Sequence, residues 1–325
     1  MSSLSDWKVP PSVRPNADDY DYDLDAALSS IVALRAHVPP DAFTAGVLGT
    51  ERAGNGVVIR ANGLVLTIGY LITEAESVWL HTGDKRTIPG HALAYDQETG
   101  FGLVQALAPL DVPPLPLGRS GEASVGEYVV VGGAGGPRRS VAARIVAKQE
   151  FAGYWEYVLD DAIFTAPAHP HWGGAALIGP KGDLLGIGSL QLEQRRAPDI
   201  VQHINMIVPV DSLKPVLDDL LTYGRPNRPP RPWLGIYAAE IEDRVVIVGL
   251  AEGGPAQRAD LRQGDIILAA GGVEVLTLLA LFRRIWSLGA AGVEAPLTVL
   301  RDGETIELRV SSGDRSQYLK KPRLH

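Results

Sequence analysis

Two histidines separated by one residue open the segment HPHWGG, residues 169–174. On an extended segment, His169 and His171 face the same side, and His203 is a candidate third imidazole for a zinc ion. Zinc sites of this type carry three or four ligands at a recognisable spacing, and no such spacing is evident here. We therefore expect surface or hydrogen-bonded histidines, with no metal site and no cofactor.

The same segment suggests a second chemistry, hydrolysis. Such a site needs a hydroxyl nucleophile, a histidine base and a carboxylate, and these groups are brought together by geometry rather than by chain order. Ser189 or Thr165 is a candidate nucleophile, and His171 is the candidate base. This arrangement stays open as an alternative to a chain without catalysis.

Composition narrows the class of protein. A chain of 325 residues has room for two or more domains, and its lack of cysteine excludes disulfides and thiolate metal sites. The net charge of −8 disfavours nucleic acid as a partner. No window approaches the roughly 18 to 20 apolar residues of a membrane span, and the N-terminal segment lacks the pattern of a secretory signal. We expect a cytoplasmic protein without a membrane span.

The pattern of apolar residues changes several times along the chain. Residues 1–43 predict an N-terminal arm and a short amphipathic helix over 23–37, with an extended conformation as the alternative for its β-branched end. Residues 44–222 contain short apolar runs separated by glycine, which predict an all-β barrel or sandwich. Asn62-Gly63 and Lys181-Gly182-Asp183 predict hairpin turns within it.

A proline-rich linker over 223–232 separates this part from a second unit. Residues 233–313 follow the order strand, strand, turn, strand, helix and hairpin, which indicates a small α+β domain. Residues 314–325 form a basic tail without pattern. The sequence therefore predicts two domains joined by a stiff linker.

Specific motifs give these parts a family resemblance. The second unit contains WLGI and GGPAQRADLRQGDIILAAGG; the first contains GNGVVIRANGLVLT, YDQETGFGLVQA and GGAALIGPKGDLLGI. In this order the motifs resemble the HtrA/Deg family, in which a trypsin-like double β-barrel precedes one or two PDZ domains. The resemblance implies a mainly β fold with a trypsin-like double β-barrel over 44–222 and a PDZ domain over 233–313. It also implies a homotrimer formed through the barrel and the N-terminal arm.

The resemblance also assigns the family's three catalytic positions. The histidine after the strand GLVLT corresponds to Tyr70, the aspartate to Gly100, and the serine before two glycines to Trp172. A phenol with a pKa near 10 is a poor base, glycine has no carboxylate, and an indole cannot attack a carbonyl carbon. We therefore expect a pseudoprotease, not an enzyme. The alternative is an HtrA-like serine endopeptidase with a rewired active site.

The PDZ-like unit predicts a peptide-binding groove. Such domains accept a peptide as an extra strand, and successive backbone N–H groups of the WLGI loop hold its terminal carboxylate. The predicted binding residues are Trp233, Leu234, Gly235, Ile236, Leu278, Leu279 and Phe282. We expect protein or peptide C-termini as partners and a scaffold or chaperone-like function. The alternative is a groove that the chain's own tail or its partner domain occupies.

Overall fold

The computed structural model describes residues 8–197 and 200–320, which form two compact units. The first unit comprises residues 8–149 and 161–226, and the second comprises residues 150–160 and 227–320. Strands outnumber helices in both units, which confirms the predicted mainly β fold. The second unit is discontinuous in sequence, because residues 150–160 come from the middle of the first unit.

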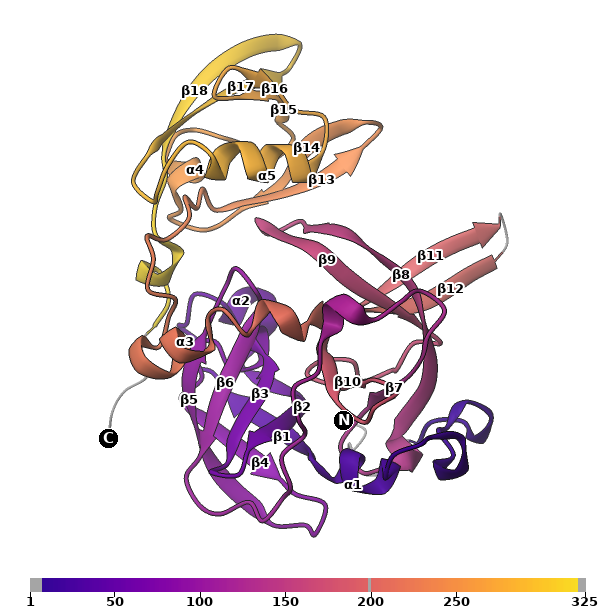
Figure 1. Ribbon diagram of the computed structural model, residues 1–325. Helices are drawn as coiled ribbons and strands as arrows, with labels where there is room; N and C mark the ends of the chain where they lie inside the picture. The colour runs from indigo at the N-terminus through magenta and orange to yellow at the C-terminus, as the bar shows by residue number, and fades with distance from the viewer. Residues whose placement is uncertain (1–7, 198–199, 321–325) are drawn as a thin grey trace. The chain divides into compact units, whose positions relative to one another are not determined.

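Six antiparallel strands close the first barrel in the order β1-β2-β3-β6-β5-β4 (Figure 1). Their bounds are β1 Ile31–His37, β2 Glu51–Arg60, β3 Leu64–Ile68, β4 Ser77–His81, β5 Thr87–Tyr95 and β6 Phe101–Ala106. Gly63 adopts φ +80° in the turn between β2 and β3, which confirms the Asn62-Gly63 hairpin prediction. Closure leaves no strand edge unpaired, so the barrel excludes water from its interior.

The second barrel also closes with six antiparallel strands, in the order β10-β11-β12-β9-β8-β7. Their bounds are β7 Tyr128–Gly132, β8 Ser140–Gly153, β9 Tyr157–Ala166, β10 Ala176–Ile178, β11 Leu184–Ala197 and β12 Ile200–Pro209. Gly182, at φ +73°, forms the predicted turn between β10 and β11. Figure 1 shows β11 and β12 continuing together well beyond the barrel.

The helix predicted over residues 23–37 is half wrong. Helix α1 spans Leu24–Ser29 and begins where the Asp23 carboxylate accepts the Ala26 N–H at 2.9 Å. Residues 31–37 instead form β1, which pairs with both β2 and β4. The β-branched pair Ile31-Val32 suits a strand, and pairing on both sides outweighs its helical spacing. The first barrel therefore begins within the predicted 1–43 arm.

The described part of the arm packs on the second barrel. Val9 is buried in that barrel's core, and its N–H donates to the Arg138 carbonyl at 3.0 Å. Two short helices complete this unit, and seven 3-10 turns lie in the described ranges. They are α2 Ala45–Leu48 and α3 Leu217–Tyr223, with η1 Pro11–Val13, η2 Ala17–Asp19, η3 Gly69–Leu71, η4 Ser120–Glu122, η5 Pro137–Arg139, η6 Val210–Ser212 and, in the second unit, η7 Arg315–Gln317.

The second unit is a sheet in the order β13-β14-β15-β17-β18, with β16 paired to β15 and helix α5 packed on it (Figure 1). The bounds are β13 Ile236–Ile241, β14 Arg244–Leu250, α4 Pro255–Arg258, β15 Ile266–Ala270, β16 Val273–Glu274, α5 Leu278–Trp286, β17 Glu294–Arg301 and β18 Glu304–Ser311. Strand β13 lies at the edge of the sheet. An edge strand beside a helix is the arrangement that accepts an added peptide strand.

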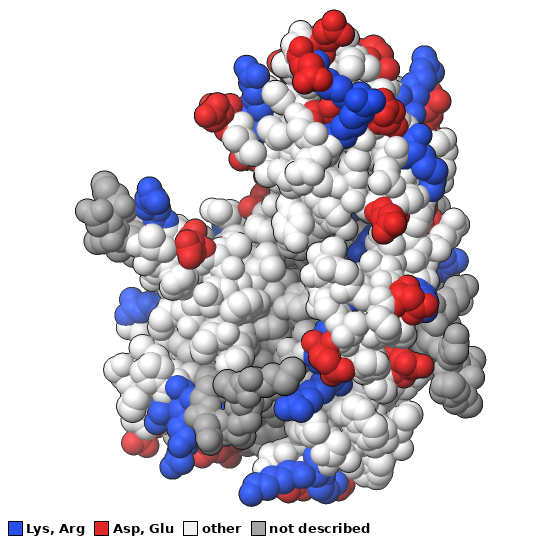
Figure 2. Space-filling view, turned by 180° about the vertical axis from the view of Figure 1, so that it is seen from behind, with Lys and Arg blue, Asp and Glu red and all other residues white. Residues whose placement is uncertain are grey.

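Surface charge and helix length bear on the expected partners. Figure 2 shows acidic and basic side chains mixed on the face drawn, without a long stripe of one sign. A nucleic-acid surface is instead typically a basic stripe. Within residues 8–197 and 200–320, the structure contains no helix with the length and apolarity needed to cross a membrane.

Candidate functional site

The loop of residues 169–174 is held rigidly between the two barrels. The Asn55 side-chain amide donates to the His171 carbonyl at 3.0 Å, and its Oδ1 accepts the Ala134 N–H at 2.9 Å. On the other side, Asn205 accepts the His169 N–H at 2.6 Å. These side chains fix the loop where the family resemblance places the nucleophile.

Tyr70 and Trp172, which the resemblance places at the family's histidine and serine positions, lie beside each other. The Tyr70 phenol donates to the Ser189 carbonyl at 2.9 Å. Burial raises the pKa of Tyr70 above its ordinary value of 10, although the indole contact acts in the opposite direction. The phenol therefore stays protonated at neutral pH and cannot accept a proton from a nucleophile.

Gly100 lies beside Tyr70, as the resemblance requires. Its carbonyl accepts the Gly69 N–H at 2.7 Å, so the two catalytic places are neighbours. The nearby Asp96 carboxylate instead accepts the Thr99 N–H and hydroxyl, at 3.2 Å and 2.8 Å. Asp96 thus stabilises the turn before β6 rather than orienting a base.

The oxyanion hole of a trypsin-like enzyme uses the N–H of the nucleophile and the N–H two residues earlier. Here the residue two places before Trp172 is Pro170, which has no N–H. The N–H of the intervening His171 donates to His169 Nδ1 at 3.0 Å. One of the two donors that stabilise a tetrahedral intermediate is therefore missing.

A cleft of about 570 Å³ lies over these positions. Tyr70 and Trp172 line it, together with the cationic or titratable side chains of Arg35, Arg139 and His171. The cleft therefore lies at the positions that the resemblance assigns to the catalytic histidine and serine.

The alternative nucleophiles lack the contacts that activation requires. Thr165 Oγ1 is buried and, within the described ranges, has no hydrogen-bond partner. Ser189 is buried, and its carbonyl accepts the Tyr70 hydroxyl. Burial lowers the pKa of His171, and Arg139 adds to this effect. Among the described residues, neither hydroxyl is hydrogen-bonded to a histidine base.

The histidines of the segment are hydrogen-bonded within the barrel. Buried His169 donates from Nε2 to the Arg139 carbonyl at 2.8 Å and accepts the His171 N–H at Nδ1. Burial lowers its pKa to about 4, so the ring is neutral. His203 lies 3.5 Å from the Gln191 side-chain amide. Among the residues described, no three His, Asp or Glu side chains are grouped as metal ligands.

The glycine pair after Trp172 has a structural explanation. Gly174 adopts φ +74°, and a Cβ on it would lie 1.9 Å from the Asn55 carbonyl oxygen. We expect Gly174→Ala to destabilise the protein by about 3 kcal/mol or more, because it adds a backbone clash to left-handed strain. The measurement is urea unfolding.

The matched control is Gly126→Ala, at φ +93° with open space around the position of its Cβ. This variant has the left-handed backbone strain without the clash, and we expect its free energy of unfolding to fall by about 1 kcal/mol. Equal losses for the two variants would show that close packing against Asn55 is not the reason for this glycine.

The second candidate site is the WLGI loop before β13. The N–H groups of Leu234, Gly235 and Ile236 all donate to the carboxylate of Glu156, at 3.0, 2.6 and 2.9 Å. The sequence correctly places three amides in one loop, and Gly235 adopts φ +78° there. Glu156 lies within residues 44–222, the predicted barrel domain, although its segment 150–160 folds with the second unit. The group on the loop therefore comes from the predicted partner domain, as the alternative prediction had it, and not from the tail.

The other predicted binding residues lie in different surroundings. Trp233 packs against the Tyr318 ring at 4.7 Å, so its ring contacts the C-terminal segment. Leu278 and Phe282 are buried in the core of the second unit, and Leu279 packs against that core. The predicted helix wall is therefore already covered in this structure.

Two residues of these sites were missed by sequence reasoning. Asn55 lies in a strand motif, and its contacts are more than 70 residues away in sequence. Glu156 lies in the segment YWEY, which has no motif of its own. In both cases, only the folded chain shows the role.

Comparison with known proteins agrees with this geometry. The family model described as trypsin-like peptidase domain matches residues 54–187, and the PDZ domain model matches residues 232–311. A probable periplasmic serine endoprotease DegP-like from Hahella chejuensis is 24% identical over 280 residues, covering 81% of this chain and 57% of that protein. The chain belongs to the HtrA-type proteins. This confirms the predicted resemblance and the barrel-plus-PDZ fold.

Other relatives extend the comparison. A DegP-like protein from Chlamydia trachomatis is 26% identical, covering 79% of this chain and 53% of the relative. The HtrA-type chain thus spans just over half the length of these curated relatives. Their names call them periplasmic, so the comparisons do not support the cytoplasmic expectation.

Solved structures share the fold of this HtrA-type chain. One is the HtrA-type protease AlgW with a tripeptide, 20% identical with a TM-score of 0.53, covering 92% of this chain and 97% of that one. Another is the serine endoprotease from Yersinia pestis, 19% identical with a TM-score of 0.52, covering 90% and 98%. At these identities the likeness describes the fold.

Proposed function

We propose that this HtrA-type protein is a pseudoprotease that recruits protein or peptide C-termini through its PDZ domain, as a scaffold or chaperone-like protein. The observation that carries the proposal is that Tyr70 and Trp172 line one cleft at the positions that the resemblance gives to the catalytic histidine and serine. It supports a site without a base or a nucleophile. Pro170 and Gly100 add the loss of an oxyanion donor and of the orienting carboxylate.

Peptide recruitment is supported by the second unit. The PDZ model matches residues 232–311, and HtrA-type structures similar to this chain hold a tripeptide or a decapeptide. Edge strand β13, helix α5 and the three loop amides provide the parts that a bound C-terminus uses. The homotrimer and the cytoplasmic location stay predictions.

Casein is expected to remain intact when incubated with the purified parent protein. A site without base, nucleophile and oxyanion donor retains at most a small fraction of the rate of a competent protease. The measurement is release of soluble peptides against enzyme concentration, beside a Trp172→Ala variant. Turnover that scales with the parent and disappears in Ser189→Ala or Thr165→Ala would instead establish a rewired endopeptidase.

A further inference from the structure

Residues 150–160, here called the hairpin tip, comprise the end of β8, the connecting turn and the start of β9, and they fold as part of the second unit. The tip is rich in aromatic residues, and its Glu156 adopts φ +59° at the turn. Although glutamate is usually exposed, Glu156 is only 4% exposed. A buried acid at the end of a hairpin needs partners that compensate for its lost hydration.

The partners of Glu156 are the amides expected to hold a peptide's terminal carboxylate. Its Oε1 accepts the N–H groups of Gly235 and Ile236, and its Oε2 accepts that of Leu234. Burial raises the pKa of Glu156 to about 7, while these three N–H groups and the Arg315 guanidinium act to lower it. The side-chain carboxylate therefore occupies the position of a chain terminus.

The backbone before Glu156 continues the likeness to a bound peptide. The Ala238 N–H on β13 donates to the Tyr154 carbonyl at 2.9 Å, two residues before Glu156. Ala238 itself lies two residues after Ile236, so alternate amides of the edge strand bond to the tip, as they would to an added strand. The Tyr154 ring also packs against the Tyr237 ring at 6.0 Å.

Side chains of the tip fill the groove and hold both arms of the hairpin. Val158 is buried in one cluster with Leu234 and Phe282, which are predicted peptide-binding residues. Arg283 of α5 forms ion pairs with Glu150 and Asp160, one on each arm. The groove thus already holds a carboxylate, a strand-like backbone bond and an apolar side chain.

We propose that the hairpin tip is an internal ligand of the PDZ groove and that an external C-terminus binds only when Glu156 leaves the WLGI loop. This proposal rests on the proposed peptide recruitment and adds its regulation. Both carboxylates need the same three N–H groups, so the two ligands exclude each other. A tethered ligand acts at a millimolar effective concentration, which lowers the apparent affinity for a free peptide.

The test uses the full chain and its Glu156→Ala and Glu156→Gln variants. The control is Glu252→Gln, which removes an exposed acid from the same unit. The probes are fluorescein-labelled peptides of sequence Gly-Gly-Ala-Tyr-Trp ending in Val, Leu, Ile, Phe or Ala, each as free acid and as amide. Their third-last tyrosine copies Tyr154, and their terminal carboxylate replaces that of Glu156.

Fluorescence anisotropy and hydrogen exchange of the amides at 234–236 give two readouts. We expect Glu156→Ala to bind a free-acid probe at least about tenfold more tightly than the parent and Glu252→Gln do. Its loop amides should exchange faster than the parent's and regain protection with the probe. Circular dichroism checks that each variant is folded, and Glu156→Gln repeats the test with the side-chain volume kept.

Three results would contradict the proposal in distinguishable ways. Equal free-acid binding by the parent and both Glu156 variants would keep peptide recruitment but reject the internal ligand. Unchanged exchange of the loop amides in Glu156→Ala would also reject it. If none of the folded variants prefers a free acid to its amide, recruitment itself fails, and the tip is a permanent part of the domain.

Discussion

Fluorophosphonate labelling of a Trp172→Ser variant is expected to stay at background, although it restores the serine of the family motif. The new hydroxyl would face the Tyr70 phenol, which is held protonated by burial and cannot serve as a base. Gly100 supplies no orienting carboxylate, and Pro170 supplies no oxyanion N–H. Loss of the base alone costs about 10⁶-fold in a serine protease, so we expect a deficit of at least that size.

The matched control for this prediction is Trp172→Ala, which opens the same space without a hydroxyl. Labelling rates of the two variants should be indistinguishable in a time course at neutral pH. A rate typical of serine hydrolases in the serine variant alone would mean that an unrecognised base lies near position 172.

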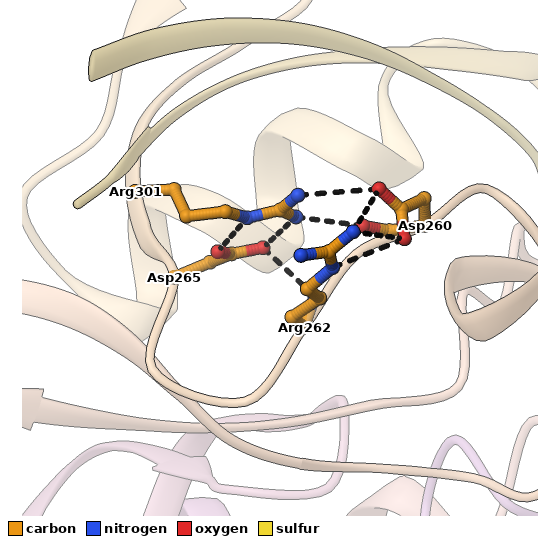
Figure 3. A network of polar contacts seen from close by, with 4 residues as sticks. All are labelled: Asp260, Arg262, Asp265 and Arg301. Carbon is orange, nitrogen blue, oxygen red and sulfur yellow. Dashed lines mark hydrogen bonds and ion pairs between the residues drawn. The ribbon is translucent and has the colours of Figure 1, made fainter.

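Arg301→Leu is expected to destabilise the second unit by about 3–5 kcal/mol, because it leaves a buried carboxylate without its cation. Figure 3 shows Arg301 bridging Asp265 and Asp260. Its guanidinium binds both oxygens of Asp265, at 2.7 and 2.8 Å, and the Asp265 side chain is 1% exposed. Urea unfolding followed by tryptophan fluorescence measures the loss.

The pH dependence of stability provides a second test of this prediction. Burial acts to raise the pKa of Asp265, but Arg301 and the Arg262 N–H hold it below its ordinary value. Because its pKa is lowered in the folded state, the ionised Asp265 carboxylate stabilises the fold at pH values above its ordinary pKa. That contribution to stability is lost as the pH falls through the folded-state pKa. The difference in the free energy of unfolding between the parent and Arg301→Leu should therefore become smaller at acidic pH.

Arg309→Leu is the control, since Arg309 forms an exposed ion pair with Glu294 on the neighbouring strand. Exposed pairs contribute about 0–1 kcal/mol. A similar loss in both variants would show that the buried pair in Figure 3 does not hold the turn before β15.

Local patterns predicted the architecture where a motif lies within one element or turn. Gly63 and Gly182 mark hairpins because only a few residue types accept a positive φ, and that preference is readable from sequence. The strand at residues 31–37 was predicted only as an alternative to the end of a helix, for the opposite reason. Ile31 pairs with Val57, and closure of the barrel depends on such distant partners.

The same distinction separates the site residues that were predicted from those that were missed. Tyr70 follows a recognisable strand, while Gly100 and Trp172 precede recognisable motifs, so counting along the chain assigns all three positions. Asn55 and Glu156 act through the carbonyls and amides of distant segments. Backbone partners carry no side-chain signature, and a single sequence gives no sign of such contacts.

The discontinuous second unit changes what can be exchanged between related proteins. Residues 227–320 look like a module because a proline-rich segment precedes them, yet Val158 completes their core and Glu156 completes their loop. A graft of residues 227–320 onto another barrel pair would lack both side chains. For this chain, the transplantable module includes residues 150–160, so a recipient barrel must carry that hairpin as well.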